Sequence, residues 1–286
     1  IPAFAGMTNE ENMMRQLVRQ LTIQKIAYGL LVMLIAAGLK YGYSQASSED
    51  LGWMLGPVAS LVEIFTGVEF LKEAGIGYVS SAKQVAIVPA CAGINFLIAA
   101  FCMTALTLIY PVRRKVILPI CIPAALAAAY GATLCANSLR IMLSMDLYHA
   151  DIYTALITPE RIHRIAGIAI YFICLSLLYL GTRKVTALHA FSGNPSPKDH
   201  GGRSNNILLT CLTPLAWYLS IALVLPAFNS AYRKNPSLFV EHSGFVLAVS
   251  FLLFILMFIG IICYKSLQPN RKPDKTYETA HSDRRR

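Results

Sequence analysis

The chain has 286 residues, of which 56% are hydrophobic and only 14% charged. A soluble domain of this length needs far more charge to cover its surface, so the composition excludes an ordinary soluble protein. The formal net charge of +10 does not indicate nucleic-acid binding, because the basic residues lie in short loops and tails beside apolar stretches, where they set membrane topology.

Apolar stretches that are long enough to cross a bilayer divide the chain, which predicts an all-α, polytopic transmembrane helix bundle. We expect six spans, in chain order 26–43, 89–110, 116–143, 159–182, 207–228 and 244–264. Residues 1–25 then form a cytoplasmic N-terminal segment, 26–264 a single transmembrane domain, and 265–286 a basic, disordered cytoplasmic tail.

The first residue is Ile1, so Met7, Met13 and Met14 are alternative starts, and residues 1–12 then need not be native. We expect no cleavable signal peptide, because the charged stretch before the first apolar run suits a retained membrane anchor.

The apolar stretch 51–71 stands apart from the six spans because Glu63 and Glu69 interrupt it. The N-terminus, the loops 111–115 and 183–206 and the tail hold 17 of the 25 lysines and arginines, so the positive-inside bias makes them cytoplasmic. Residues 44–88 must then begin and end outside. We therefore predict that 51–71 is an interfacial or re-entrant helix, since a carboxylate at mid-bilayer is costly.

One segment at the start of the second span differs in composition from a lipid-facing helix: Val-Pro-Ala-Cys-Ala-Gly-Ile-Asn-Phe, residues 88–96. If Pro89 opens the helix, Cys91 lies in its first turn, where the helix dipole and free amide hydrogens favour the thiolate. Gly93 leaves space for another backbone, and Asn95 lies one turn below Cys91 on the same face. The alternative is a buried structural cysteine.

Two further segments lie at the outer ends of spans. Arg140 is near the end of an apolar run, with Asn137 one turn earlier on its face; it either lines a polar site or snorkels to the interface. His163 shares a helix face with Gly167, four residues on, and is either a base or an ordinary interface residue. Thr158, before Pro159, is typical of an N-cap at the start of that helix.

The predicted topology brings these three segments to one depth at the outer membrane face. A thiol, a cation and an imidazole at one level form a plausible acyl-transfer site. In it Cys91 is the nucleophile, His163 moves protons, and Arg140 steadies the oxyanion.

The segments Pro-Ala-Cys91-Ala-Gly93, Asn137-Ser-Leu-Arg140-Ile and His163 with Gly167 resemble the three motifs of the exosortase/archaeosortase family in order, spacing and placement at span ends. The resemblance covers residues 26–183. Many exosortases have serine after the cysteine, whereas this chain has Ala92. The Cys-Ala-Gly-Ile-Asn-Phe version is more similar to the small subclass called exosortase K.

The resemblance implies a membrane thiol protease and transpeptidase of protein sorting, in the inner membrane of a bacterium, with its site facing the periplasm. The substrates would be exported proteins with a C-terminal signal made of a Pro-Glu-Pro-like motif, a transmembrane helix and a basic tail. Cofactors and metals are not implied, and the seven cysteines have neither CxxC nor metal-ligand spacing. The partners are then these exported proteins and the lipid bilayer, without nucleic acid.

Three alternatives remain from other classes. A small-solute transporter would use Arg140 and His163 to line a pathway, but it predicts more polar residues in the span centres than 97–108 and 168–178 contain. A structural or assembly subunit would leave Cys91 inert. A thiol oxidoreductase needs a second cysteine at redox spacing on the outer face, which the sequence does not offer.

Overall fold

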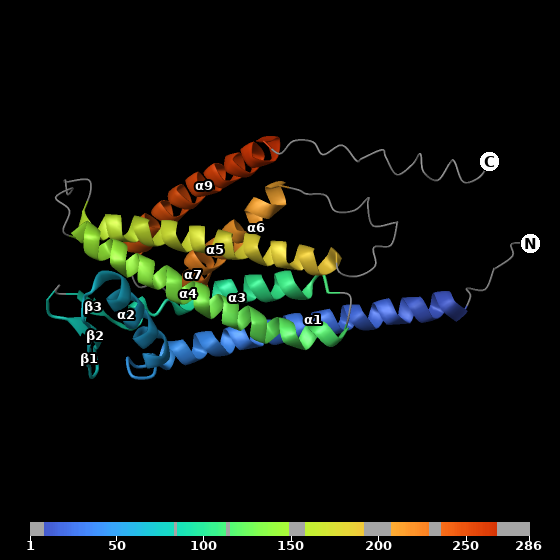
Figure 1. The fold of residues 1–286 in the computed structure, drawn as a ribbon, viewed down its shortest axis with the longest axis horizontal. Helices are drawn as coiled ribbons and strands as arrows, with labels where there is room; N and C mark the ends of the chain where they lie inside the picture. The colour runs from blue at the N-terminus through green and yellow to red at the C-terminus, as the bar shows by residue number, and fades with distance from the viewer. Residues whose placement is uncertain are drawn as a thin grey trace, which may run out of the picture.

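The computed structural model describes residues 9–82, 85–112, 115–148, 158–191, 207–228 and 236–267. These residues form a bundle of long helices (Figure 1). Six segments are long and apolar enough to cross a membrane: Val18–Gln45, Pro89–Ile109, Leu118–Tyr148, Arg161–Ala187, Ile207–Val224 and Phe239–Tyr264. The protein is therefore a multi-pass membrane protein, and the predicted all-α helix bundle is confirmed.

The spans belong to helices that extend beyond their apolar parts. The helices are α1 (Asn9–Gln45), α3 (Ile94–Ile109), α4 (Leu118–Tyr148), α5 (Pro159–Phe191), α6 (Ile207–Leu219) and α9 (Pro236–Leu267). A π-helical turn, η4 (Ser220–Val224), joins α6 to the short α7 (Leu225–Phe228). The predicted loop from residue 183 is wrong as far as Phe191, because hydropathy marks where a helix leaves the membrane, while arginine and lysine continue it readily. The remainder of that loop and the C-terminal tail from 268 lie outside the described residues.

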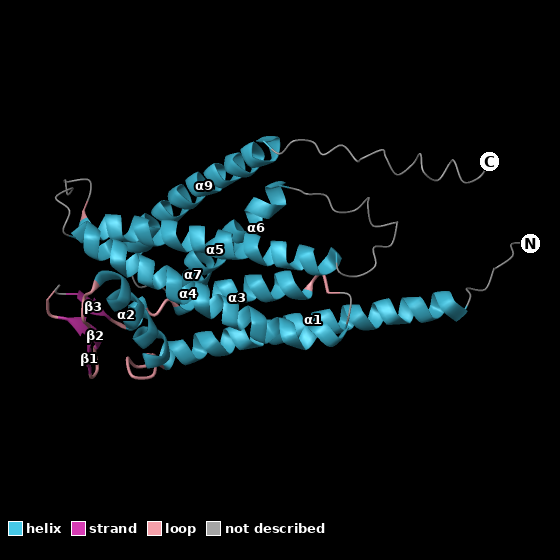
Figure 2. Ribbon diagram, viewed as in Figure 1, coloured by secondary structure: helices cyan, strands magenta, loops and turns pink. Residues whose placement is uncertain are grey.

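The stretch after α1 forms a small unit of one helix and three strands at one end of the bundle (Figure 2). Its helix α2 (Gly52–Thr66) has 15 residues, or about 22 Å at ~1.5 Å per residue, which is too short to cross the ~30 Å hydrocarbon layer. It packs beside α4, where Trp53 stacks on Tyr130 with ring centroids 5.8 Å apart. This agrees with the predicted interfacial or re-entrant helix.

The sequence analysis missed a three-stranded antiparallel sheet after α2. Its strands are β1 (Leu71–Glu73), β2 (Gly77–Ser80) and β3 (Val85–Ile87), with β2 in the centre. Glu63 joins helix and sheet, since its carboxylate accepts a 2.7 Å hydrogen bond from the backbone N–H of Phe70. Glu63, whose carboxylate argues against a membrane crossing, thus attaches the start of the sheet to α2.

Glu49 holds the β1–β2 turn from the other side. Its carboxylate accepts a 2.7 Å hydrogen bond from the backbone N–H of Gly75. This bond, helped by the Ser48 hydroxyl, lowers the pKa of the Glu49 carboxyl to about 2. The carboxylate is therefore ionised, and the turn remains attached, throughout the ordinary pH range.

Helix α3 lies at the centre of the bundle. All residues from Phe96 to Ala105 are buried. The α4 helix contributes a stripe of small residues to the contact, with Ala125, Ala129 and Ala136 fully buried. Small side chains let two helices approach closely in lipid, where packing rather than the hydrophobic effect holds helices together. The close α3–α4 pair fixes where the outer end of α3 meets α4.

The arrangement of the helices agrees with the prediction that both ends of the helical part lie on one side of the membrane and residues 44–88 on the other. The start of α1 and the end of α9 point toward one end of the bundle, and α2 with the three strands lies at the other (Figure 1). Reporter fusions at Lys72 in β1 and after Leu267 at the end of α9 should therefore report opposite sides of the membrane. Fusions that report the same side would contradict the six-span topology.

Candidate active site

Cys91 lies in a tight turn that precedes α3. Residues Pro89–Cys91 form a single 3₁₀ turn, closed by a 2.7 Å hydrogen bond from the backbone N–H of Cys91 to the carbonyl of Val88. The thiol is half-buried at the start of the span. Proline suits this position because its fixed φ begins the turn and its missing N–H is not needed there.

The expectation that Cys91 belongs to the first turn of the α-helix is wrong. Gly93, in the left-handed conformation with φ +67°, is the N-cap residue, and α3 begins only at Ile94. A left-handed residue cannot continue a right-handed helix, so it separates the cysteine turn from α3. Cys91 therefore faces the positive end of the α3 dipole from just outside the helix.

Gly93 rests directly on the side chain of Asn137 from α4. A Cβ atom at position 93 would lie 2.3 Å from the Asn137 Nδ2 atom and 2.6 Å from its Oδ1 atom. Such distances are far below van der Waals contact, so only glycine fits both the φ angle and the space. This contact joins the cysteine segment to the Asn137–Arg140 segment. The space at Gly93, predicted to admit another backbone, is taken up by the Asn137 side chain.

Arg140 lies at the centre of a polar cluster between α4 and α5. Its Nη2 atom donates to the Nε2 atom of His163 over 3.0 Å, and its Nη1 atom donates to the Tyr171 hydroxyl over 3.1 Å. The Tyr171 hydroxyl in turn donates to Asn137 Oδ1 over 2.6 Å. Gly167 lies beneath the guanidinium, where a Cβ atom would be 3.1 Å from the Arg140 Nε atom. The second and third predicted segments are thus in direct contact.

The hydrogen bonds define the tautomer of His163. An arginine can only donate, so the Nε2 atom that faces it must carry the lone pair and Nδ1 must carry the hydrogen. Nδ1 is 2.6 Å from the Ser144 hydroxyl, which itself donates to the Arg140 carbonyl over 2.6 Å. His163 is therefore neutral in this arrangement, with both ring nitrogens occupied.

Asn95 does not join this cluster. It accepts a 2.8 Å hydrogen bond from the Lys40 ammonium group of α1. The same helix supplies Tyr43, whose hydroxyl is 3.5 Å from the carbonyl of Pro89. Helix α1 thus packs beside the cysteine turn. Asn95 binds α1 and does not support the thiol.

The Cys91 thiol is near the cluster without being bonded to it. The cysteine turn reaches the cluster through Gly93, which contacts Asn137, and reaches α1 through Tyr43, whose hydroxyl is 3.5 Å from the Pro89 carbonyl. Within the described part of the chain, no hydrogen bond links the thiol to His163, whose nitrogens are occupied. The structure therefore brings all three segments together, in an arrangement where the thiol and the imidazole are not yet paired.

Two polar atoms of the cluster are buried without a hydrogen-bond partner. They are Asn137 Nδ2 and Arg140 Nε. An unpaired buried donor costs about 1–3 kcal/mol, and seven other side-chain atoms of the described residues are buried in the same way. Both atoms belong to side chains that the sequence analysis selected.

The sequence analysis missed Tyr171 and Ser144. Tyr171 links all three helices, because its hydroxyl bonds to two α4 side chains and its ring stacks on Phe96 of α3 at 5.0 Å. Its position carries a usable signal, since 163, 167 and 171 repeat every four residues and so share one face of α5. Ser144 follows Arg140 at the same spacing on α4.

All seven cysteines are free thiols, and the six other than Cys91 lie within the spans. In the described residues, no group of three histidines, cysteines or acids is close enough to hold a metal ion. Comparisons with known protein families, with curated proteins and with solved structures find no match for this chain.

The Gly93–Asn137 contact can be tested by stability alone. Gly93→Ala should lower the melting temperature of the detergent-solubilised protein, because alanine costs about 1–2 kcal/mol in the left-handed conformation and also displaces Asn137. Gly131→Ala is the matched control: it is in the interior of α4, nothing lies within 4 Å of its added Cβ, and alanine is about 1 kcal/mol better there. Equal stability of the two variants would contradict the contact.

Proposed function

We propose that this protein is a membrane-embedded cysteine peptidase and transpeptidase of the exosortase type. It cleaves the C-terminal sorting signals from exported proteins at the outer membrane–water interface and transfers the proteins to an acceptor. The observation that carries the proposal is the contact of Arg140 with His163 and, through Tyr171, with Asn137, at the end of the bundle where Cys91 begins its span. Three segments with a family-like pattern are distant in sequence and adjacent in space.

The proposed chemistry begins with attack of the Cys91 thiolate on the scissile carbonyl. His163 takes the thiol proton and returns it to the leaving amine, while a thioester forms on Cys91. An acceptor amine or water then attacks the thioester and releases the thiol. Arg140 stabilises the negative charge that develops on the carbonyl oxygen in both steps.

The resting hydrogen bonds support a substrate-triggered order of events. While Arg140 donates to His163, the lone pair of Nε2 is unavailable as a base. A substrate carbonyl that draws the guanidinium toward itself would release that lone pair for the Cys91 proton. Ser144 keeps the Nδ1 hydrogen in place during the exchange. The enzyme would thus remain inactive toward water until a peptide enters.

The fold is compatible with substrates that are themselves membrane-anchored. The apolar bundle lies in the bilayer, and the proposed site is at the end of the spans that bears α2 and the sheet (Figure 1). A substrate whose transmembrane helix follows its cleavage motif would present that motif at this level. We also propose that the protein lies in the inner membrane of a bacterium with the site facing the periplasm. The resemblance to exosortases supports the membrane, and the positive-inside bias supports the side.

The role of Arg140 can be separated from simple snorkelling. Arg140→Lys should leave the protein in the membrane but reduce cleavage of a reporter with a Pro-Glu-Pro-like signal, an apolar helix and a basic tail by about a hundredfold, as for loss of an oxyanion donor. One ammonium group cannot reproduce the planar fork that contacts His163 and Tyr171 together. Full cleavage activity of the lysine variant would remove Arg140 from the proposed site.

The nucleophile gives the sharpest test. Cys91→Ser and Cys91→Ala should both reduce reporter cleavage by at least about 10³-fold while the protein still accumulates, because serine is almost fully protonated at neutral pH and the site has no strong base for it. Cys102→Ala and Cys174→Ala are the controls, since these thiols pack inside spans and should affect stability only.

A substrate-derived thioester trapped on Cys91 would establish the covalent step directly. Normal processing by Cys91→Ala would refute the enzymatic function, whatever the pattern of the other motifs.

A further inference from the structure

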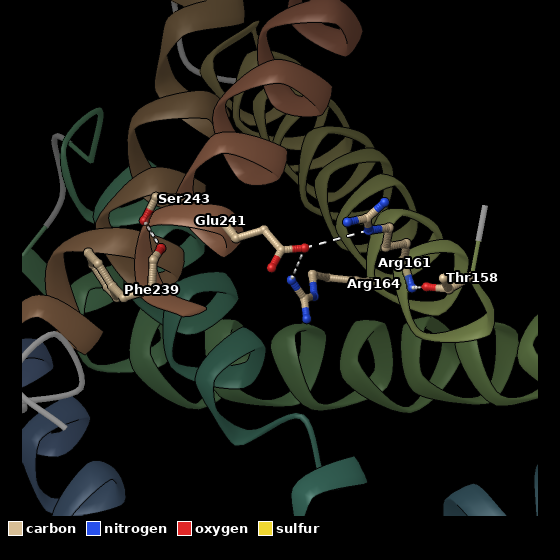
Figure 3. Close-up of polar contacts among 6 residues, drawn as sticks. All are labelled: Thr158, Arg161, Arg164, Phe239, Glu241 and Ser243. Carbon is tan, nitrogen blue, oxygen red and sulfur yellow. Dashed lines mark hydrogen bonds and ion pairs between the residues drawn. The ribbon is translucent and has the colours of Figure 1, made fainter. Parts of the chain in front are cut away.

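The two arginines that flank His163 are bound to a single carboxylate of another helix. Glu241, near the start of α9, is 3.6 Å from Arg161 Nε and 3.7 Å from Arg164 Nη1 through the same oxygen (Figure 3). Figure 3 shows the carboxylate pointing between the two guanidinium groups. Arg164 also lies over the ring of Phe245, one turn further along α9, at 6.0 Å.

These contacts are on a different side of α5 from the proposed catalytic cluster. His163 faces Arg140 and Ser144 of α4, whereas Arg161 and Arg164 face α9. Arginines three residues apart are neighbours on a helix surface, so one acid that bridges them holds the turn between them. His163 is in that turn.

The first turn of α5 is thereby held from three directions. Thr158 caps it, with its hydroxyl accepting a 3.3 Å hydrogen bond from the backbone N–H of Arg161. Arg140 and Ser144 hold the imidazole from α4, and Glu241 holds the backbone turn from α9. Glu241 is the third residue of the span Phe239–Tyr264 and its side chain is 40% exposed, so its charge lies near the membrane surface, at the level of the arginines that it meets.

We propose that Glu241 is a positioning residue of the proposed reaction, which fixes the His163 turn through Arg161 and Arg164. The proposal rests on the proposed function only for the role of His163. It gives the last two spans, which lie beyond the family-like segments, a part in the chemistry: α9 supplies the anchor against which α5 presents its imidazole.

The test uses the full-length protein in native membranes and needs no substrate. A membrane-impermeant maleimide is applied from outside, and its rate of addition to Cys91 is followed by mass spectrometry of the Cys91 peptide. The maleimide carbonyl oxygens can draw the Arg140 guanidinium away from His163 as a substrate carbonyl would, so His163→Ala should slow this rate by about tenfold or more, within what a general base contributes. Glu241→Gln should slow it by a similar factor. Ser243→Ala should not, because among the described residues Ser243 bonds to its own helix, at the Phe239 carbonyl (Figure 3).

Two combinations distinguish positioning from general support of the fold. In the His163→Ala background, Glu241→Gln should cause no further loss, because residues that act through one another are not additive. The swap Glu241→Arg with Arg164→Glu should recover most of the rate that Glu241→Arg alone loses. Additive losses, an unrecovered swap in a protein that accumulates normally, or a wild-type rate for Glu241→Gln would each overturn the proposal.

The outcome is independent of the reporter assay. If Cys91→Ala still processes the reporter, the peptidase function fails, while the maleimide rates continue to decide whether Glu241 acts on Cys91 through His163.

Discussion

The guanidinium group of Arg140 imposes the central constraint on this bundle. A permanent cation among apolar spans is costly unless polar groups surround it. Here its two Nη atoms donate to His163 and Tyr171, the cation lies 5.5 Å from the Tyr171 ring centre, and Gly167 leaves room for its unpaired Nε atom. All these partners belong to α5. Satisfying one charge therefore fixes α4 and α5 in a single register.

That register determines the place of the cysteine, although the cysteine is on a third helix. With Arg140 fixed, Asn137 is presented one turn lower, where it accepts the Tyr171 hydroxyl and supports the left-handed Gly93. Gly93 ends the 3₁₀ turn that carries Cys91. The thiol is thus positioned through backbone packing rather than through a hydrogen bond of its own.

Hydropathy and charge predicted the six spans and the short outer helix because lipid thickness and positive-inside bias act on composition alone. The pairing of Asn137 with Arg140, and of His163 with Gly167, followed from helical periodicity. Periodicity did not reveal the three strands, whose segments of three or four residues are too short to carry a pattern, nor the 3₁₀ turn, which depends on Gly93 meeting Asn137. Tyr171 escaped notice because an aromatic residue in an apolar run is ordinary until its hydroxyl partners are known.

The last two spans complete the cluster rather than merely extend the bundle. From α6, Tyr218 packs edge-on against Phe172 of α5 at 5.9 Å. Two residues later the π-helical turn η4 begins, a local widening that is often found at functional sites. From α9, Glu241 reaches Arg161 and Arg164. Because these contacts reach α5 from outside the α3–α4 pair, the helix that carries His163 and Tyr171 is supported by the last two spans as well. The 26–183 segment alone would lack that support, so the three motif segments and the C-terminal spans form one physical unit.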